Sequence, residues 1–372
     1  MLASGSTRIS EMVAALPQRL QRQFHHAKAL YRFLDNERVS APAILERVYQ
    51  ESILGIKEEG ERLVCVDLSP VKKPYARVME GLHRVGRKKV LGYELLTCLG
   101  VDQESHLALG YAHLVAYGER GFRSLPWEVK RAFQRAQKQL GGPGVRLIYV
   151  CDRGFDDRRV FTQVLEMGEA FVIRVYHDRL LERGGKLKGI ATGLELPYQY
   201  QARLKVRGKY RQVAVHFGFT PIEVEGKQLT LVVSSVPALG KRGRWWLLTN
   251  LLVGRAEEAR RVVEIYRKRW LIEEFFRLLK TGLGLEGFQV ERLVRIRKVI
   301  AILLGLAVFL WELQLEESPF KQFLLRLGGK LGIKSEGDGP YLLLRGLIRL
   351  LNYEVTREEL ERAQGKEEMS YG

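Results

Sequence analysis

Short apolar runs dominate the first half of the chain. Three of them have the length and composition of β-strands, and they span residues 62–67, 92–100 and 106–118. Amphipathic segments then alternate with further apolar runs, which predicts a helix, a strand, a helix and a strand over residues 125–142, 146–152, 156–168 and 171–176. Three consecutive strands followed by this alternation predict an α/β fold with a mixed sheet flanked by helices.

The pattern changes in the second half. Alternating apolar residues with glycine turns predict a small antiparallel β module over residues 178–250. Helical spacing returns over 256–282, and a fully buried helix is predicted over 296–313. Its apolar run at 299–311 is shorter than the roughly 20 residues that cross a bilayer, so no membrane partner is expected.

Both ends of the chain are predicted to be helical. Residues 1–60 combine helical spacing with many basic side chains, among them His25 and His26. Two shorter helices are predicted over 317–328 and 340–352, and the polar end from residue 356 is expected to fray.

The charge of the chain narrows the class of partner. There are 61 Lys and Arg against 43 Asp and Glu, which gives a formal net charge of +18. This balance favours a polyanion, nucleic acid rather than a membrane surface, although a merely basic enzyme is the alternative. Three cysteines without a CxxC pair predict buried, reduced thiols and a cytoplasmic protein, and the N-terminus lacks the order of a signal peptide.

One helical segment carries an unexpected polar stripe. On a regular helix Tyr266, Arg269, Arg277 and Lys280 all project within about 40° of Glu273. Apolar side chains fill the opposite arc, so the core side is accounted for without this stripe. A solvated face with an Arg–Glu pair is the simple interpretation. The neighbouring aromatic Trp270 and acids elsewhere in the chain favour a functional one.

Those other acids stand where apolar strands end. Asp67 and Asp152 each interrupt a run of Val, Leu, Ile and Cys, and a carboxylate at a core edge is costly unless it is paired or binds a metal. With Glu273 they form a set of three carboxylates, which suits Mg²⁺, and two such ions can activate an attacking oxygen and stabilise a leaving one. His106, His113 and His177 show no metal-ligand spacing and are predicted to be structural. Asp156 and Asp157 are predicted to cap the following helix.

These residues resemble a known family. The spacing Tyr-2-Arg-3-Glu-6-Lys, here Tyr266, Arg269, Glu273 and Lys280, is similar to the signature of DDE transposases of the insertion-sequence-four family. The family's first acid follows a strand, as in LVCVDLSP, and its second opens an Asp-Arg-Gly-Phe box, as at Asp152 and Arg153. The resemblance covers about residues 60–315.

The resemblance implies a ribonuclease-H-like fold with an inserted antiparallel β module. It implies that Asp67, Asp152 and Glu273 are catalytic and bind Mg²⁺, with Mn²⁺ as a substitute. It also implies that the chain cuts transposon ends and joins them to target DNA, as an endonuclease and strand transferase acting as a homodimer in a prokaryotic cytoplasm, associated with the nucleoid. We expect a DNA-binding region over residues 1–60. The catalytic core is expected in two parts, 61–177 and 251–315, with the β module inserted between them at 178–250. A region of possible dimerisation is expected over 316–372.

The DNA contacts expected from the sequence follow the stripe and the tryptophans. Arg269, Lys280 and Tyr266 would hold the backbone, with Arg153 beside the second acid. In some relatives a tryptophan at the end of the insert holds a flipped base. Trp245 or Trp246 matches it, with core packing as the alternative, and Trp270 is a further stacking candidate.

Two other functions fit the same residues. One is a catalytically inactive or domesticated sequence-specific DNA-binding relative, which the intact acids argue against. The other is a general nuclease of the same fold, which would degrade DNA without joining strands.

Overall fold

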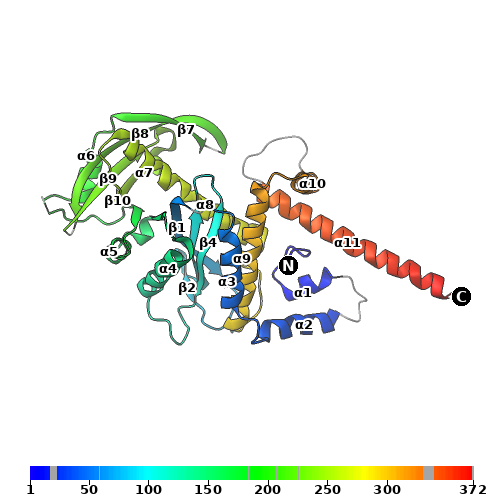
Figure 1. Ribbon diagram of the computed structural model, residues 1–372. Coiled ribbons are helices and arrows are strands. Elements are labelled where there is room, and N and C mark those ends of the chain that lie inside the picture. The colour runs from blue at the N-terminus through cyan, green and yellow to red at the C-terminus, as the bar shows by residue number, and fades with distance from the viewer. Residues whose placement is uncertain are drawn as a thin grey trace.

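The structure is a computed structural model, and it describes residues 1–16, 23–57, 59–182, 184–206, 208–224, 226–329 and 339–370. The described residues form one ten-stranded sheet with helices on both faces (Figure 1). The predicted α/β class with a mixed sheet is confirmed.

The first six strands form the core of the sheet. They are β1 Gly60–Lys72, β2 His83–Val85, β3 Val90–Val101, β4 Leu107–Val115, β5 Val145–Cys151 and β6 Ala170–Arg174. β1 pairs antiparallel with β3 and parallel with β5, and β6 continues the parallel part. All the strands predicted in this part of the sequence are present, and β1 is longer than predicted because it runs five residues past Asp67.

The predicted β module continues this sheet. Its strands are β7 Tyr198–Val206, β8 Lys209–Val224, β9 Lys227–Ser235 and β10 Arg244–Thr249. They pair antiparallel in the order β10–β9–β8–β7, and β10 also pairs antiparallel with β6 through Leu248 and Ile173. The inserted strands therefore extend the core at its β6 edge, with helix α6 Leu187–Gly193 preceding them.

Side-chain alternation along β1 separates two layers. Leu63 and Cys65 face a layer that contains α7 Ala256–Lys268, α8 Trp270–Arg277 and α9 Leu293–Leu315. Val64 and Val66 face the opposite layer, which contains α4 Leu125–Leu140 and α5 Arg158–Glu166. Asp67 has the parity of Cys65, so its carboxylate lies on the α8 side of the sheet.

The free edge of β4 is covered by helix α3 Ala41–Ile53. The Ala112 amide donates to the Tyr49 hydroxyl at 3.0 Å, and the Leu109 amide donates to the Ser52 hydroxyl at 3.0 Å. These bonds satisfy backbone groups that an edge strand would leave unpaired.

The terminal regions are helical, as predicted. At the N-terminus α1 Ile9–Ala14 and α2 Gln23–Asp35 precede α3, while residues 17–22 of the basic stretch lie outside the described residues. α2 is held to the core by Lys298 of α9, whose ammonium donates to the Leu34 and Asn36 carbonyls at 2.8 and 2.9 Å.

At the C-terminus α10 Pro319–Leu327 precedes the long helix α11, Gly339–Ser370. α11 extends away from the rest of the molecule, on the side opposite the inserted strands (Figure 1). Within the described residues α11 is helical to Ser370, and the expectation that this end frays stays a prediction.

Two predictions about buried segments are confirmed. All three cysteines are buried and free of disulfides. The apolar run 299–311 is the middle of α9 and packs in the core, and none of the described helices is long and apolar enough to cross a membrane.

Candidate active site

The first two acids lie on neighbouring strands. Val66 of β1 is the register partner of Cys151 of β5, so Asp67 and Asp152 are the next positions on the two strands. Adjacent strands lie about 4.8 Å apart, and this spacing places the two acids side by side. The parallel β1–β5 pair explains how acids 85 positions apart in the sequence come together.

Asp152 begins a tight turn. It caps a single 3₁₀ turn, Arg153–Phe155, and its carboxylate accepts the Gly154 amide at 2.7 Å. A Cβ at Gly154 would stand 3.0 Å from this carboxylate, so glycine leaves the acid room to turn toward Asp67. Arg153 is exposed beside it.

The two following acids have different roles. Asp157 caps α5, as predicted, by accepting the Arg159 amide at 2.8 Å. The cap predicted for Asp156 is wrong. Its buried carboxylate accepts the Tyr176 and His177 amides at 2.6 and 2.8 Å and pairs with Arg179 at 2.7 Å. Asp156 therefore fastens the segment after β6 to the Asp152 turn.

The third acid is carried by a helix that changes pitch twice. Between α7 and α8 the bonds tighten to the i to i+3 pattern, from the Arg269 amide to the Tyr266 carbonyl and from the Ile272 amide to the Arg269 carbonyl. After Arg277 the chain widens into a π-helical turn, Leu278–Gly282, which carries Lys280. The single regular helix assumed for the stripe is therefore wrong at both ends of α8, although Glu273 lies on its first turn.

This helical segment runs alongside β1. Arg261 pairs with Glu61, the Lys268 carbonyl accepts from Cys65, and the Arg269 guanidinium contacts Asp67 at 3.3 Å. Later residues of the helical segment contact later residues of β1, so the two elements run in the same direction. This arrangement brings Asp67 close to the first turn of α8.

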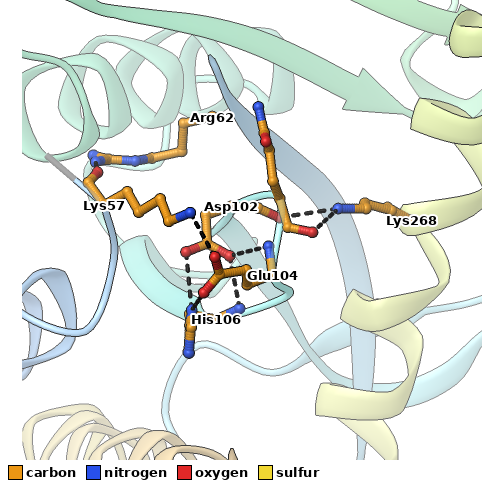
Figure 2. Close-up of polar contacts among 7 residues, drawn as sticks. Lys57, Arg62, Asp102, Glu104, His106 and Lys268 are labelled. Atoms are coloured by element: carbon orange, nitrogen blue, oxygen red, sulfur yellow. Dashed lines mark hydrogen bonds and ion pairs between the residues drawn. The ribbon is translucent and has the colours of Figure 1, made fainter. Parts of the chain in front are cut away.

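Lys268 fixes the break between the two helices. Its ammonium donates to the Asp102 and Gln103 carbonyls at 3.0 and 2.9 Å (Figure 2). These carbonyls belong to the β3–β4 turn, which the buried Asp102 carboxylate organises by accepting the Glu104 and His106 amides, both at 2.9 Å, and by contacting the His106 ring at 3.0 Å. The residue before Arg269 is thus tied to a rigid turn.

Arg269 is the centre of the charge arrangement. Its guanidinium bridges Asp67 and Glu273, and Arg269 and Asp67 are largely buried. Burial raises the pKa of Asp67 to about 6; Arg269 lowers it, and the nearby carboxylates of Asp152 and then Glu273 raise it. Burial opposes the charge of Arg269, but the Tyr266, Glu273 and Asp67 side chains raise its pKa overall. Burial is the largest cause of the raised pKa of Asp67, and the charges of Asp152 and Glu273 add to it, so the three acids lie close enough to act on one another.

Tyr266 does not lie on the open face of the helix. Its side chain is only 4% exposed, and its ring packs edge-on against Trp245 with centroids 5.0 Å apart. The tightened turn at Arg269 separates it from the Glu273 face. The expected exposure of Tyr266 is wrong, and its ring instead supports the Arg269 guanidinium, 5.9 Å from the ring centroid.

The adjacent tryptophans of β10 point to opposite faces. Trp245 packs in the layer of α7 and α8, and Trp246 packs in the layer of α4 and α5. Both are half-buried, so the core-packing interpretation holds in part for each. Trp245 is the one on the side of the acids. Trp270 is 58% exposed and its indole donates to Glu274 at 3.0 Å.

Lys280 extends the site toward the end of β1. Its pKa is lowered, first by burial, while Glu286 raises it, Lys72 lowers it and Asp67 raises it. Lys280 therefore lies within electrostatic range of both Asp67 and Lys72. Two pockets, of about 390 and 490 Å³, are lined by none of the three acids.

A protein-family model described as a transposase DDE domain matches residues 58–309, more than half of the chain. The chain belongs to the DDE transposases. It is a DNA-binding enzyme of DNA transposition and recombination, and its mixed sheet flanked by helices fits the ribonuclease-H-like fold expected from the sequence.

DDE transposases generally use divalent metals, and the donor set here can be tested against that need. No group of three His, Cys, Asp or Glu side chains in the described parts of the chain is arranged to hold a metal. The guanidinium of Arg269 bridges two of the acids. Three carboxylates are nevertheless the kind of ligand that hard divalent cations take. The chemistry of the acids therefore suits a divalent metal, while their arrangement in the described residues, with Arg269 between two of them, is not that of a metal site.

Two residues that shape this transposase site, Lys268 and Asp102, were not predicted from the sequence. Lys268 reads as one more cation of a basic helix, and Asp102 reads as part of a polar turn. A turn with an acid followed by polar residues does favour local bonds to backbone amides, which could have indicated the role of Asp102. Nothing local indicates that Lys268 reaches this turn.

Proposed function

We propose that this DDE transposase belongs to the insertion-sequence-four family, cuts DNA at transposon terminal repeats and joins the ends to target DNA. The observation that carries the proposal is that Asp67 and Glu273 converge on the Arg269 guanidinium, with Asp152 beside Asp67 on the neighbouring strand. The four-residue spacing from Tyr266 to Lys280 supports the family.

Asp67, Asp152 and Glu273 would hold Mg²⁺, with Mn²⁺ as a substitute. When bound, the metal supplies activation of the attacking oxygen and stabilisation of the leaving oxygen in phosphodiester cleavage. The fixed strand positions of Asp67 and Asp152 keep two of the ligands in register before any metal arrives.

Arg269 has two partners in turn. In the structure it pairs with Asp67 and Glu273. When the acids bind a cation, the guanidinium is free to bind a DNA phosphate at the same place, and its planar donors suit two phosphate oxygens. Tyr266 and Lys268 keep it near the acids, one through its ring and one through the adjacent backbone.

Further DNA contacts come from side chains around the acids. Lys280 supplies a point charge at the end of the segment, and Arg153 lies exposed beside Asp152. Trp245, on the face of the acids, is the better placed of the adjacent pair to hold a flipped base. Trp270, largely exposed, is a second surface on which a base can stack.

The division of the chain completes the proposal. The helices of 1–60 would contact the terminal repeat, and the two core parts at 61–177 and 251–315 would cut it. The strands of 178–250 would hold the distorted end, and 316–372 would join two copies in a homodimer that pairs the ends, in the cytoplasm of a prokaryote.

The test uses the Glu273→Gln variant. Purified protein is incubated with Mg²⁺ or Mn²⁺ and a labelled duplex that carries the element's own terminal repeat. Wild type should cut at the repeat boundary and join ends to a target duplex. Glu273→Gln should lose cutting by at least about 1,000-fold and keep binding, because only a metal ligand is removed.

Glu274→Gln is the matched control. Glu274 is the next residue on α8 and pairs with Arg277, away from the acids, so this variant should cut at nearly the wild-type rate. Binding without cutting by wild type would instead support the inactive DNA-binding relative. Degradation of any duplex without joining would support a general nuclease.

A further inference from the structure

The loop that follows β1 concentrates positive charge on an exposed surface. Residues 72–89 contain seven Lys and Arg against a single acid, Glu80, which amounts to six of the chain's eighteen net positive charges. We name this segment the 72–89 loop. Of its cations only Lys73 is buried, and the exposed ones are Lys72, Arg77, Arg84, Arg87, Lys88 and Lys89.

These exposed cations have no acidic partner in the described parts of the chain. Among the described residues, their side-chain hydrogen bond runs from the Arg84 guanidinium to the Lys89 carbonyl at 3.3 Å, and this bond leaves the charge uncompensated. The single acid is occupied elsewhere, because the Glu80 carboxylate accepts the Leu293 amide at 2.7 Å at the start of α9. Several arginines on α7 and α9, by contrast, pair with acids, as Arg260 does with Glu264 and Arg297 with Glu119.

The base of the loop is held rigidly. The Lys73 ammonium donates to the Glu286 carbonyl at 2.8 Å and to the Phe288 carbonyl, and it lies 3.4 Å from the Phe288 ring centroid. The Tyr93 hydroxyl donates to the Glu80 carbonyl at 2.6 Å. A surface anchored in this way presents its charges at a fixed place, which lowers the entropy cost of binding an extended partner.

The loop stands at a defined distance from the acids. Lys72 follows Asp67 by five residues on the same strand, which is roughly 16 Å at about 3.3 Å per residue. The rest of the loop lies beyond Lys72, because Gly92 pairs with Lys72 and His83 while Val90 pairs with Val85, farther from Asp67. At about 3.4 Å per nucleotide, 16 Å is about five base pairs of a duplex that starts at the acids, and this is the nearest limit of the loop.

The loop also lies on a defined side of the acids. In the sheet order, β2 of this loop is at one edge, β1 and β5 with the acids follow, and the inserted strands β10 to β7 occupy the other edge. A duplex that contacts the insert on one side of the cut bond therefore meets this loop on the other side. Tyr75, 94% exposed within the loop, adds an aromatic ring that packs on nothing in the fold.

We propose that the 72–89 loop binds the phosphate backbone of duplex DNA five or more base pairs from the cut bond, on the side opposite the inserted strands. This inference rests on the proposed function for the position of the bond. The partner before cutting is the DNA that flanks the terminal repeat, and the contact does not depend on base sequence, because the loop offers charges to phosphates.

The first experiment measures backbone binding alone. A random-sequence 30-base-pair duplex is titrated with wild type and with the Arg87→Gln, Lys88→Gln double variant in EDTA, between 50 and 200 mM salt. Removing two phosphate contacts should weaken binding about fivefold or more at 100 mM salt and lower the slope of log affinity against log salt by about 1.8. Equal slopes would overturn the proposal.

A matched control has the same loss of charge. Lys138 and Arg146 are also exposed, and Arg146 is near the start of β5, at the opposite end of that strand from Asp152. The Lys138→Gln, Arg146→Gln variant should keep the wild-type slope. An equal fall of the slope in both double variants would show a general charge effect and refute the loop as a site.

The second experiment places the contact. Duplexes carrying the terminal repeat are extended by 0, 3, 6 or 12 base pairs of flanking DNA, and binding is measured in EDTA. Wild type should gain affinity mainly between 3 and 12 base pairs, and the loop variant should lose this gain. A gain that the variant keeps would refute the placement. Cutting of the repeat by wild type, measured separately, tests the proposed function, so the two ideas can fail independently.

Discussion

Replacing Arg269 with glutamine tests whether its guanidinium stands in for a metal. Asp67 and Arg269 are 19% and 12% exposed, and Glu273 is 35% exposed. Breaking a buried ion pair costs about 3–5 kcal/mol and losing an exposed one costs less than about 1 kcal/mol. The bridge formed by Arg269 is partly buried, so the cost of losing it lies between these two values. Arg269→Gln should therefore lower the free energy of unfolding by about 2–3 kcal/mol without metal.

The assay is thermal unfolding in EDTA and in Mn²⁺. A loss of this size lowers Tm by about 3–4 °C, because about 2.1 cal/mol/K per residue gives an unfolding entropy of about 0.8 kcal/mol/K for 372 residues. Metal should then raise Tm more in Arg269→Gln than in wild type, because no guanidinium has to be displaced before the acids bind. Saturation at a hundred times Kd adds about 2.7 kcal/mol, which is about the size of the loss.

The pH dependence of this deficit has a definite sign. The pKa of Asp67 is about 6 in the fold and its ordinary value is 3.8, so ionisation of Asp67 destabilises the metal-free fold above pH 6 and not below pH 3.8. Arg269 lowers this pKa, so its loss raises the pKa further and the Tm deficit should grow from pH 6 to pH 8.

The control for this prediction is Arg277→Gln. Arg277 lies on the same helix, is itself 46% exposed, pairs with Glu274 and lies 5.3 Å from the Tyr341 ring centroid, so the change should stay within about 1 kcal/mol. If Arg269→Gln melts with wild type in EDTA and gains no more from Mn²⁺, the reasoning is refuted.

Three further predictions concern residues outside the acids. Lys268→Met should slow cutting about tenfold to a hundredfold with DNA binding retained, because the turn that fixes Arg269 is released; an unchanged cutting rate would contradict this. Burial, then Arg297 and Arg131, lower the pKa of His113 to about 4, so the stability linked to its neutral ring is present above pH 6.5 and is lost as pH falls toward 4; His113→Gln should show a flatter fall of Tm over that window, and identical curves would refute it. Lys298→Met should release α2 and speed limited proteolysis at residues 35–40, whereas an unchanged cleavage pattern would show that other contacts suffice.

The sequence predicts well whatever depends on local pattern. The strand that carries Asp67, the strand that ends just before Asp152 and the amphipathic helix with Glu273 follow from runs of apolar side chains, and the structure contains all three elements. Asp67 was expected at a strand end but lies within β1, and it meets Asp152 because the parallel β1–β5 register places Val66 beside Cys151.

What depends on distant partners could not be predicted. The helical wheel assumes an unbroken pitch, so it placed Tyr266 with Glu273, whereas the tightened turn at Arg269 separates them and Trp245 covers the ring. Asp156 reads as a helix cap because its partners Tyr176 and Arg179 lie 20 residues or more along the chain. The contact from Lys268 to the β3–β4 turn spans more than 160 residues.

The pairing of β10 with β6 has a consequence for how the chain folds. Leu247 must reach Arg174 across an intervening segment of about 70 residues, and closing a loop of that length costs about 4 kcal/mol of chain entropy before the pairing is gained. The hairpins of β7, β8 and β9 have short connections and can form first. Until β10 arrives, the edge of β6 is an open template for wrong pairing.

The order of elements along the chain makes this step decisive. Asp67 and Asp152 precede the inserted strands, and Glu273 follows them. The pairing of β10 with β6 therefore brings the next segment of the chain, which includes α8, close to β1. A chain stalled before that closure would carry two of the acids without the third. The same strand pairing that completes the sheet is therefore also the event that completes the set of acids, and folding slowly at this point delays the appearance of a nuclease.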